Sequence, residues 1–219
     1  MDESMWLTFS MSLPMNKLQP ENNNAVSTGK PWTRIPKLIV FDLDFTLWYR
    51  EMYELAGPPF HRDTDGIVHA CDGEAVHLFD DVHPILHEIA LSPAFADTRV
   101  AVASSTEFPA WARECMGLIL VHFQAMSEDE KDQQRKRQLN ATAEPLGKLL
   151  HFQAIYPTNK RVHFKQLRDE SGVEYEDMLF FDNESGNYQD ISSIGVTSVY
   201  CPDGMTLDAW REGMGKFQK

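Results

Sequence analysis

Two aspartates with the potential for chemistry, Asp42 and Asp44, directly follow an apolar run at residues 37–41. Side chains alternate along an extended chain, so both carboxyl groups point to the same side. Carboxylates held this close repel each other, and the repulsion is relieved by a divalent cation or by a raised pKa of one carboxyl group. Both solutions serve catalysis. The alternative is a pair of acids that occupies a turn or caps a helix.

Other apolar runs are followed by polar residues in the same way. These residues are Ser104 and Ser105 after residues 99–103, Lys160 after residues 152–156, and Asp182, Asn183 and Glu184 after residues 178–181. Together with the first two aspartates they supply a carboxylate that can attack, an ammonium group, hydroxyl groups and a second acidic cluster. Phosphoryl transfer requires such a set.

The elements that must position these residues can be predicted from the apolar pattern. The runs are short and uniformly apolar, which is typical of parallel strands buried on both faces. The predicted strands are residues 37–41, 99–103, 152–156, 178–181 and 196–200, and the predicted helices are residues 84–91, 109–122 and 160–171. This alternation predicts a three-layer, doubly wound α/β fold around a parallel five-stranded sheet, with the site at the carboxyl ends of the strands.

Three segments lie outside this alternation. In residues 57–80, two Asp-Gly turn signals flank short extended runs, which predicts a small β-hairpin flap and no large cap domain. Residues 124–146 are rich in charge and predict a solvated helix or loop, with a binding element as the alternative. Residues 1–36 have linker chemistry, so we expect a disordered extension before a single domain at residues 37–219, or else a segment docked on that domain.

Composition limits the partners and the compartment. Lys and Arg number 20 against 33 Asp and Glu, and the net charge of −13 excludes a broadly basic surface for nucleic acid. No apolar run reaches the ~18 residues of a membrane span. The early acids Asp2 and Glu3 argue against a secretory signal, and three widely spaced cysteines favour a reducing compartment. We therefore expect a cytoplasmic or nuclear monomer that is not secreted and has no nucleic-acid or membrane partner.

The motifs together resemble those of the haloacid dehalogenase superfamily of phosphohydrolases. Residues 42–46, Asp-Leu-Asp-Phe-Thr after a strand, resemble its motif I, while Ser104, Lys160 and the pair Asp182-Asn183 stand in the order of motifs II, III and IV. Other stretches are similar to the eukaryotic magnesium-dependent phosphatase family: residues 40–48, 58–61, 155–157, 163–164, 180–182, 195–197 and 203–205. The resemblance covers roughly residues 35–207 without the charged insertion, and it implies a Rossmann-like fold.

The resemblance also implies a role for each catalytic residue. Asp42 would be the nucleophile that forms an aspartyl-phosphate. Asp44 would protonate the leaving oxygen and later activate water, so its carboxyl group must first hold a proton. Lys160 would offset the charge of Asp42 and of the bound phosphate. The implied cofactor is Mg²⁺, held by the Asp42 carboxylate, the backbone carbonyl of Asp44 and an oxygen from Asp182 or Asn183.

The remaining residues bear on substrate and metal affinity. Thr46 and Ser104 would position other groups or donate to the phosphate, and Ser105 stands where related phosphatases often carry a basic residue. Motif IV of the family often has two adjacent acids, so Asn183 predicts weaker metal binding, with Asp182 or Glu184 as possible replacements. We expect a small phosphorylated metabolite or a phosphotyrosine-type protein side chain as the substrate. The alternatives are a catalytically weakened binding or regulatory module and, less favoured, a phosphotransferase or dehalogenase.

Overall fold

The computed structural model describes residues 32–122 and 143–219. Their central element is a five-stranded sheet with the strand order β11-β10-β1-β6-β9. Its strands are β1 (Leu38–Phe41), β6 (Arg99–Ser104), β9 (Phe152–Ile155), β10 (Met178–Asp182) and β11 (Thr197–Tyr200). Each neighbouring pair runs parallel. The predicted doubly wound α/β fold and its five strands are therefore confirmed.

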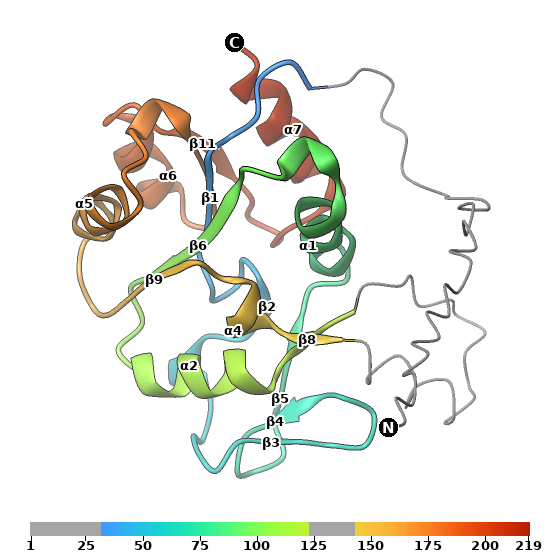
Figure 1. Ribbon diagram of the computed structural model, residues 1–219. Coiled ribbons are helices and arrows are strands. Elements are labelled where there is room, and N and C mark those ends of the chain that lie inside the picture. Colours follow the sequence, from blue (N-terminus) through green and yellow to red (C-terminus); the bar gives the residue numbers. More distant parts are fainter. Residues whose placement is uncertain (1–31, 123–142) are drawn as a thin grey trace, which may run out of the picture. The chain divides into compact units, whose positions relative to one another are not determined.

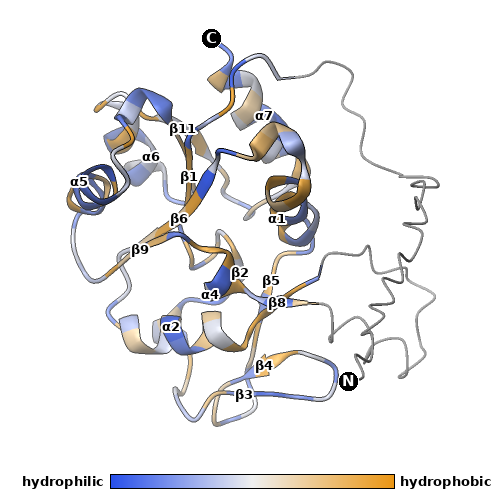
Figure 2. Ribbon diagram, viewed as in Figure 1, coloured by the Kyte–Doolittle hydropathy of each residue, from blue (hydrophilic) through white to orange (hydrophobic). Residues whose placement is uncertain are grey.

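Helices cover both faces of this sheet. Helices α1 (Val82–Leu91) and α7 (Leu207–Phe217) lie on one side, and α5 (Lys160–Ser171) and α6 (Ser185–Ser192) lie on the other (Figure 1). Alternate residues of β1 enter the two cores: Ile39 belongs to the cluster with α1 and α7, and Val40 to the cluster with α5 and α6. Because both faces of these strands are buried, neither face carries polar side chains, which explains the uniformly apolar runs. Figure 2 shows this contrast between the mostly hydrophobic strands and the largely hydrophilic α5.

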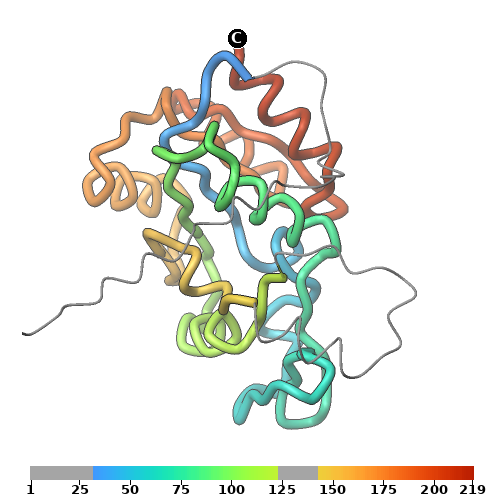
Figure 3. The backbone as a smooth tube through the Cα atoms, turned by 45° about the vertical axis from the view of Figure 1, so that its right-hand side comes forward, coloured from blue at the N-terminus to red at the C-terminus, as the bar shows by residue number. Residues whose placement is uncertain are grey.

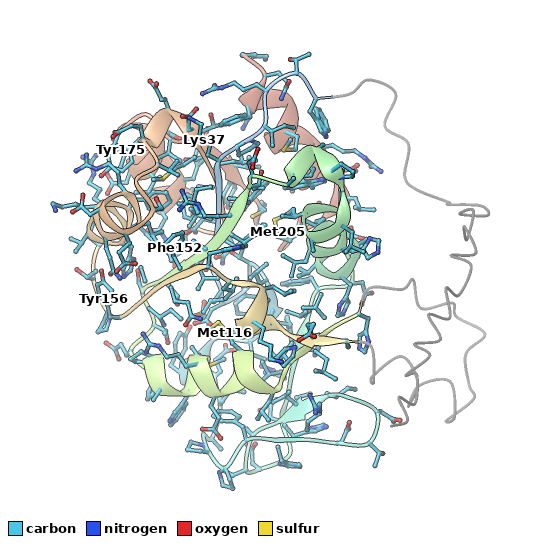
Figure 4. The ribbon with its side chains drawn as sticks, in the orientation of Figure 1. Lys37, Met116, Phe152, Tyr156, Tyr175 and Met205 are labelled. Carbon is cyan, nitrogen blue, oxygen red and sulfur yellow. The ribbon has the colours of Figure 1, made fainter. Side chains whose placement is uncertain are left out.

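The carboxyl ends of all five strands lie at the same end of the sheet. Lys37, which precedes β1, and Tyr175, which precedes β10, lie toward one end of the sheet, and Tyr156, which follows β9, lies toward the other (Figure 4). Helix α5 begins at this second end. Its N-cap Asn159 accepts a hydrogen bond from the backbone of Arg161, and Gly172 ends it in the left-handed conformation with φ of 66°. The predicted helix at residues 160–171 is confirmed.

The predicted helix at residues 109–122 is too long. Helix α2 (Pro109–Leu118) ends where Ile119 becomes extended, and β7 (Leu120–Val121) then pairs with β8 (Glu144–Pro145). Leu120 and Val121 are buried in the strand, and buried residues of a helix are apolar as well, so their apolar character could not mark the end of the helix. Most of the predicted insertion at residues 124–146 lies outside the described residues. Its last part forms β8 and the start of α4 (Leu146–Leu149), where the backbone amide of Leu146 donates to Ile119.

The flap is a small sheet of its own, larger than the predicted hairpin. It contains β2 (Trp48–Tyr49), β3 (His61–Arg62), β4 (Val68–His69) and β5 (Ala75–Leu78), in the antiparallel order β2-β5-β4-β3. The additional strand, β2, comes from residues directly after motif I. Figure 3 shows the flap in cyan projecting from the rest of the domain. Short 3-10 helices occur at Met52–Glu54, Pro93–Phe95 and Tyr175–Asp177.

The domain begins before the predicted boundary at residue 36. Residues 32–36 pack on its surface: the guanidinium of Arg34 lies 4.2 Å from the ring centroid of Phe217, and Gln218 Nε2 donates to the Arg34 carbonyl at 2.7 Å. Trp32 and Ile35 contact the larger hydrophobic core. The rest of the predicted extension, residues 1–31, lies outside the described residues. Within residues 32–122 and 143–219, no helix has the length and apolar character of a membrane span.

Candidate active site

A cleft of about 200 Å³ opens at the carboxyl ends of the central strands. Six of the residues predicted to form the site line it: Asp42, Asp44, Ser104, Ser105, Lys160 and Asn183. Thr46 and Asp182 are fully buried next to the cleft without lining it. Segments far apart in the sequence therefore converge at the edge of the sheet where the carboxyl ends meet.

Asp42 follows the central strand and is tied to both neighbouring strands. Its backbone amide donates to the carbonyl of Phe181 at 3.0 Å, which continues the pairing of β1 with β10. Its side chain pairs with Lys160, whose Nζ also donates to the carbonyl of Ala103 in β6 at 2.5 Å. The Asp42 carboxylate is therefore held at a fixed place in the cleft, where it remains 7% exposed.

Lys160 is a buried cation between two acids. Burial by itself would lower its pKa, but the carboxylates of Asp42 and Asp182 outweigh burial and raise the pKa above the ordinary value. Lys160 is only 2% exposed, so this charge is directed at the acids and the cleft. His163, one turn further along α5, donates from Nε2 to the carbonyl of Tyr156 at 2.9 Å and so connects α5 to the end of β9.

Thr46 links motif I to motif IV. Its hydroxyl accepts from the backbone amide of Asn183 at 3.1 Å and lies 3.2 Å from Asn183 Oδ1 and 3.4 Å from Asp42 Oδ2. Because Thr46 has no exposed surface, it positions these groups and does not reach the cleft. The two serines do reach it. Ser105 also donates to the carbonyl of Thr158 at 2.9 Å, which ties motif II to the loop before Lys160.

Asp44 is a carboxyl group with a strongly raised pKa. Burial, and then repulsion from Asp42, raise the pKa of Asp44 to about 8. Trp48 Nε1 donates to Asp44 Oδ1 at 2.7 Å, which opposes this rise but does not cancel it. The raised pKa favours the protonated form of Asp44, the state in which a carboxyl group can act as a general acid.

Sequence reasoning missed several residues of the cleft. Glu51 and Tyr53, from the segment between β2 and the flap hairpin, line the cleft, as do Glu107 and Asn187. Burial, followed by the charges of Asp42 and Glu184, raises the pKa of Glu51 to about 7. Nothing in the sequence around Glu51 distinguishes it from other acids. Trp48 did carry a signal, because a buried indole N–H requires an acceptor and an aspartate stands four residues before it.

Only one of the two predicted metal ligands in motif IV lines the cleft. Asn183 lines it together with Glu184, whereas Asp182 is fully buried. Asp182 Oδ1 accepts from the backbone amide of Glu184 at 2.7 Å and from Asn187 Nδ2 at 3.3 Å, and its Oδ2 lies 3.4 Å from Lys160 Nζ. The side chain of Asp182 thus shapes its own loop and pairs with Lys160.

The oxygen atoms at the cleft suit a hard cation. Among the lining residues, Asp42 offers a carboxylate and Asn183 an amide oxygen. In the described parts of the chain, no three His, Cys, Asp or Glu side chains are grouped as a metal cage. Mg²⁺ does not need such a cage, because it keeps several waters and binds one or two carboxylates together with substrate phosphate. The donor set therefore fits magnesium.

Comparisons with known proteins agree with this geometry. A model of the acid phosphatase family matches residues 34–219. Human magnesium-dependent phosphatase 1 is 30% identical over 186 residues, which cover 85% of this chain and 89% of the human protein. An HAD-like hydrolase superfamily protein of Schizosaccharomyces pombe is 28% identical over 164 residues, which cover 74% of this chain and 83% of that protein.

Similarity to solved structures is more remote. The N-terminal part of the Bacteroides fragilis protein BF1531, which contains a phosphatase domain, superposes with a TM-score of 0.48 at 12% identity. That match covers 78% of this chain and 37% of the other. The family model, by contrast, spans nearly all of the described residues. The chain belongs to the acid phosphatase family, within the haloacid dehalogenase superfamily.

Proposed function

We propose that this protein is a magnesium-dependent phosphomonoester hydrolase that works through an aspartyl-phosphate on Asp42. The observation that carries the proposal is the pairing of Asp42 with the buried ammonium of Lys160 at the cleft. Asp44, two residues further along, lines the same cleft with a pKa raised to about 8. A charged nucleophile beside a proton-bearing acid is the combination that this chemistry uses.

The reaction would proceed in two steps. A carboxylate oxygen of Asp42 attacks phosphorus while the bond from phosphorus to the leaving oxygen breaks, and Asp44 gives its proton to that oxygen. Asp44, now ionised, takes a proton from a water molecule that attacks the aspartyl-phosphate. The bond between phosphorus and Asp42 breaks, inorganic phosphate leaves, and Asp44 is again protonated. Lys160 keeps Asp42 in place and offsets negative charge throughout.

The metal would be held by the Asp42 carboxylate, the backbone carbonyl of Asp44 and the amide oxygen of Asn183. Bound Mg²⁺ supplies positive charge against the oxygens of the transferring phosphoryl group. The hydroxyl of Ser104 and the backbone around Ser105 lie at the carboxyl end of β6, on the other side of β1 from β10 and Asn183, where they would orient the phosphate. Thr46 supports the site indirectly, since it connects Asn183 to motif I.

The substrate would be a small phosphorylated molecule or a phosphorylated protein side chain. A cleft of about 200 Å³ is smaller than the pockets that enclose drug-sized ligands, so a bulky substrate would remain partly outside it. Within residues 32–122 and 143–219, the flap is a small four-stranded sheet, and these residues form one compact unit without a second domain over the cleft. Acidic residues such as Glu51, Glu107 and Glu184 line the cleft and disfavour polyanionic substrates.

The direct test is hydrolysis of 4-nitrophenyl phosphate by the purified protein with Mg²⁺ or with a chelator, beside an Asp42→Asn variant. We expect turnover that needs Mg²⁺ and is abolished by the substitution. Acid-quenched wild-type enzyme should carry phosphate on the peptide containing Asp42, and hydroxylamine should remove it. Turnover that survives Asp42→Asn would refute the mechanism. Intact Mg²⁺ binding without any turnover would instead support a weakened binding module.

A further inference from the structure

Trp48 and Asp44 form a buried contact that the reaction scheme has not used. The indole Nε1 of Trp48 donates to Asp44 Oδ1 at 2.7 Å. Trp48 has no exposed surface, and Asp44 is 8% exposed where it lines the cleft. The backbones of the two residues also form a β-bridge. The contact therefore joins an aromatic core residue to the acid that would move the proton.

An indole N–H can only donate, so it distinguishes the two oxygens of a carboxyl group. The oxygen that receives this hydrogen bond, Oδ1, must present a lone pair. In a neutral acid the carbonyl oxygen is the stronger acceptor, so this hydrogen bond favours Oδ1 as the carbonyl oxygen and Oδ2 as the oxygen that carries the proton. Asp44 also hydrogen-bonds to the backbone of Met52 and to the Glu51 side chain, and the Trp48 indole is the rigid, donor-only partner among the three. Without it, rotation about χ2, which is a soft torsion, would exchange the roles of the two oxygens more readily.

The indole itself is held by the fold and does not depend on the substrate. Trp48 begins β2 and pairs with Leu78 of β5, and its backbone amide donates to the carbonyl of Leu43 at 3.3 Å. On the other side of this pairing, Phe79 donates to the carbonyl of Leu47 at 3.0 Å. The ring belongs to the larger hydrophobic cluster. Trp48 is therefore held by contacts of the fold and does not itself line the cleft.

We propose that Trp48 is a positioning residue for proton transfer by Asp44: its N–H holds Oδ1, so that Oδ2 carries the proton to the leaving group and later receives one from water. This inference rests on the proposed function, because it assumes that Asp44 is the general acid and base. Trp48 does not touch the substrate in this scheme. Its effect reaches the reaction only through the orientation of one carboxyl group.

The test uses Trp48→Phe, which keeps an aromatic ring and removes the N–H. Two substrates of similar size are compared: benzyl phosphate, whose alcohol needs a proton to leave, and 4-nitrophenyl phosphate, whose phenol leaves as an anion. The measured quantity is kcat/KM, which reports steps up to the formation of the aspartyl-phosphate. We expect kcat/KM for benzyl phosphate to fall at least about tenfold more than for 4-nitrophenyl phosphate. Asp44→Asn should show the same selectivity, more strongly.

Trp111→Phe is the matched control. Trp111 stacks on Phe108 with ring centroids 4.3 Å apart and contacts Phe60 of the flap, so its truncation also loosens aromatic packing beside the flap. It should lower both kcat/KM values by the same factor or leave both unchanged. If Trp48→Phe does not fold, benzothienylalanine at position 48 keeps the bicyclic shape and removes only the N–H.

The outcomes separate the two proposals. Selective loss with benzyl phosphate in the position-48 variant, and none in the control, supports positioning by Trp48. An equal loss with both substrates means that Trp48 contributes packing alone, and it overturns this inference while the proposed function stands. If Asp44→Asn itself shows no selectivity between the substrates, or if the wild-type enzyme hydrolyses neither, the proposed function fails.

Discussion

Asp182 Oδ2 lies 3.4 Å from the Nζ of Lys160, which is also paired with Asp42. One buried cation therefore serves two buried acids from adjacent strands, β1 and β10. Burial, then repulsion from Asp42, raises the pKa of Asp182, and the charge of Lys160 opposes that rise. Lys160 thus has a structural role besides its proposed catalytic one. Without its charge, the two buried carboxyl groups would have no cation between them.

Lys160→Met should destabilise the fold strongly. The substitution keeps an unbranched side chain that is one atom shorter and removes the charge, which leaves Asp42 and Asp182 buried without a cation. Breaking a buried ion pair in this way costs about 3–5 kcal/mol. The free energy of unfolding in urea at pH 7 measures the effect.

The matched control for this variant is Lys165→Met, on the exposed side of α5. Lys165 pairs with Asp169 at 2.6 Å, but their side chains are 66% and 48% exposed, so the pair contributes little. Equal destabilisation by the two variants would contradict a structural role for the Lys160 charge.

Relative to the wild type, the Asp44→Asn variant should gain stability against unfolding as the pH rises. The folded pKa of Asp44 is about 8 against 3.8 for an ordinary aspartate, so the folded protein binds this proton more tightly than the unfolded chain does. The resulting stabilisation is complete below about pH 4 and is lost as the pH rises through about 8. An amide does not titrate, and its oxygen can still accept from Trp48. Between pH 5 and 8, the variant should gain up to about 1.4 kcal/mol per pH unit over the wild type.

The measurement for Asp44→Asn is urea unfolding in metal-free buffer across this pH range. Asp177→Asn is the control: Lys37 and Arg34 lower the pKa of Asp177, so that carboxyl group is ionised in both the folded and the unfolded state above pH 5. Its difference from the wild type should be constant. A constant difference for Asp44→Asn as well would mean that Asp44 ionises normally in the folded protein.

The strands of the central sheet were predictable because the pattern that identifies each of them lies within the strand itself. Residues such as Ile39 and Val40 enter opposite cores, so every position of the strand must be apolar, and the polar residue after it marks the open edge. The end of α2 was not predictable in this way. Leu120 and Val121 are not helical because they pair with residues 144–145. This partner is more than twenty residues away, and its position depends on the tertiary fold.

The same distinction applies to the site. Asp42, Ser104, Lys160 and Asn183 each follow the end of a predicted strand, so the topology alone brings them together. Glu51 reaches the cleft because the chain turns back after motif I, with positive φ angles at two non-glycine residues, Phe45 and Arg50. Such conformations are rare for these residue types and leave no mark in the sequence. Thr46 was named correctly as a site residue, but only the structure shows that it is buried beneath the cleft.

Two glycines of α7 should respond in opposite ways to alanine. A Cβ at Gly213 would lie 2.6 Å from Cζ of Phe181 and 3.0 Å from Val199, whereas a Cβ at Gly215 meets nothing within 4 Å. Gly213→Ala should cost about 1–3 kcal/mol through overpacking. Gly215→Ala should stabilise the helix by up to about 1 kcal/mol. Thermal or urea unfolding of the two variants tests the close packing of α7 on the sheet, and changes of the same sign would contradict it.

Asn183→Asp should lower the Mg²⁺ requirement of the enzyme. Asn183 lines the cleft, and its Oδ1 lies 3.2 Å from the Thr46 hydroxyl, so the proposed ligand is a neutral amide oxygen. A carboxylate at this position adds a full charge to the ligand set, which should reduce the Mg²⁺ concentration for half-maximal activity on the order of tenfold. Thr106→Asp is the control, because it adds the same charge to the cleft wall and can still accept from the amide of Phe108. A similar shift in both variants would indicate general attraction of the cation, and no shift in Asn183→Asp would mean that residue 183 does not bind the metal.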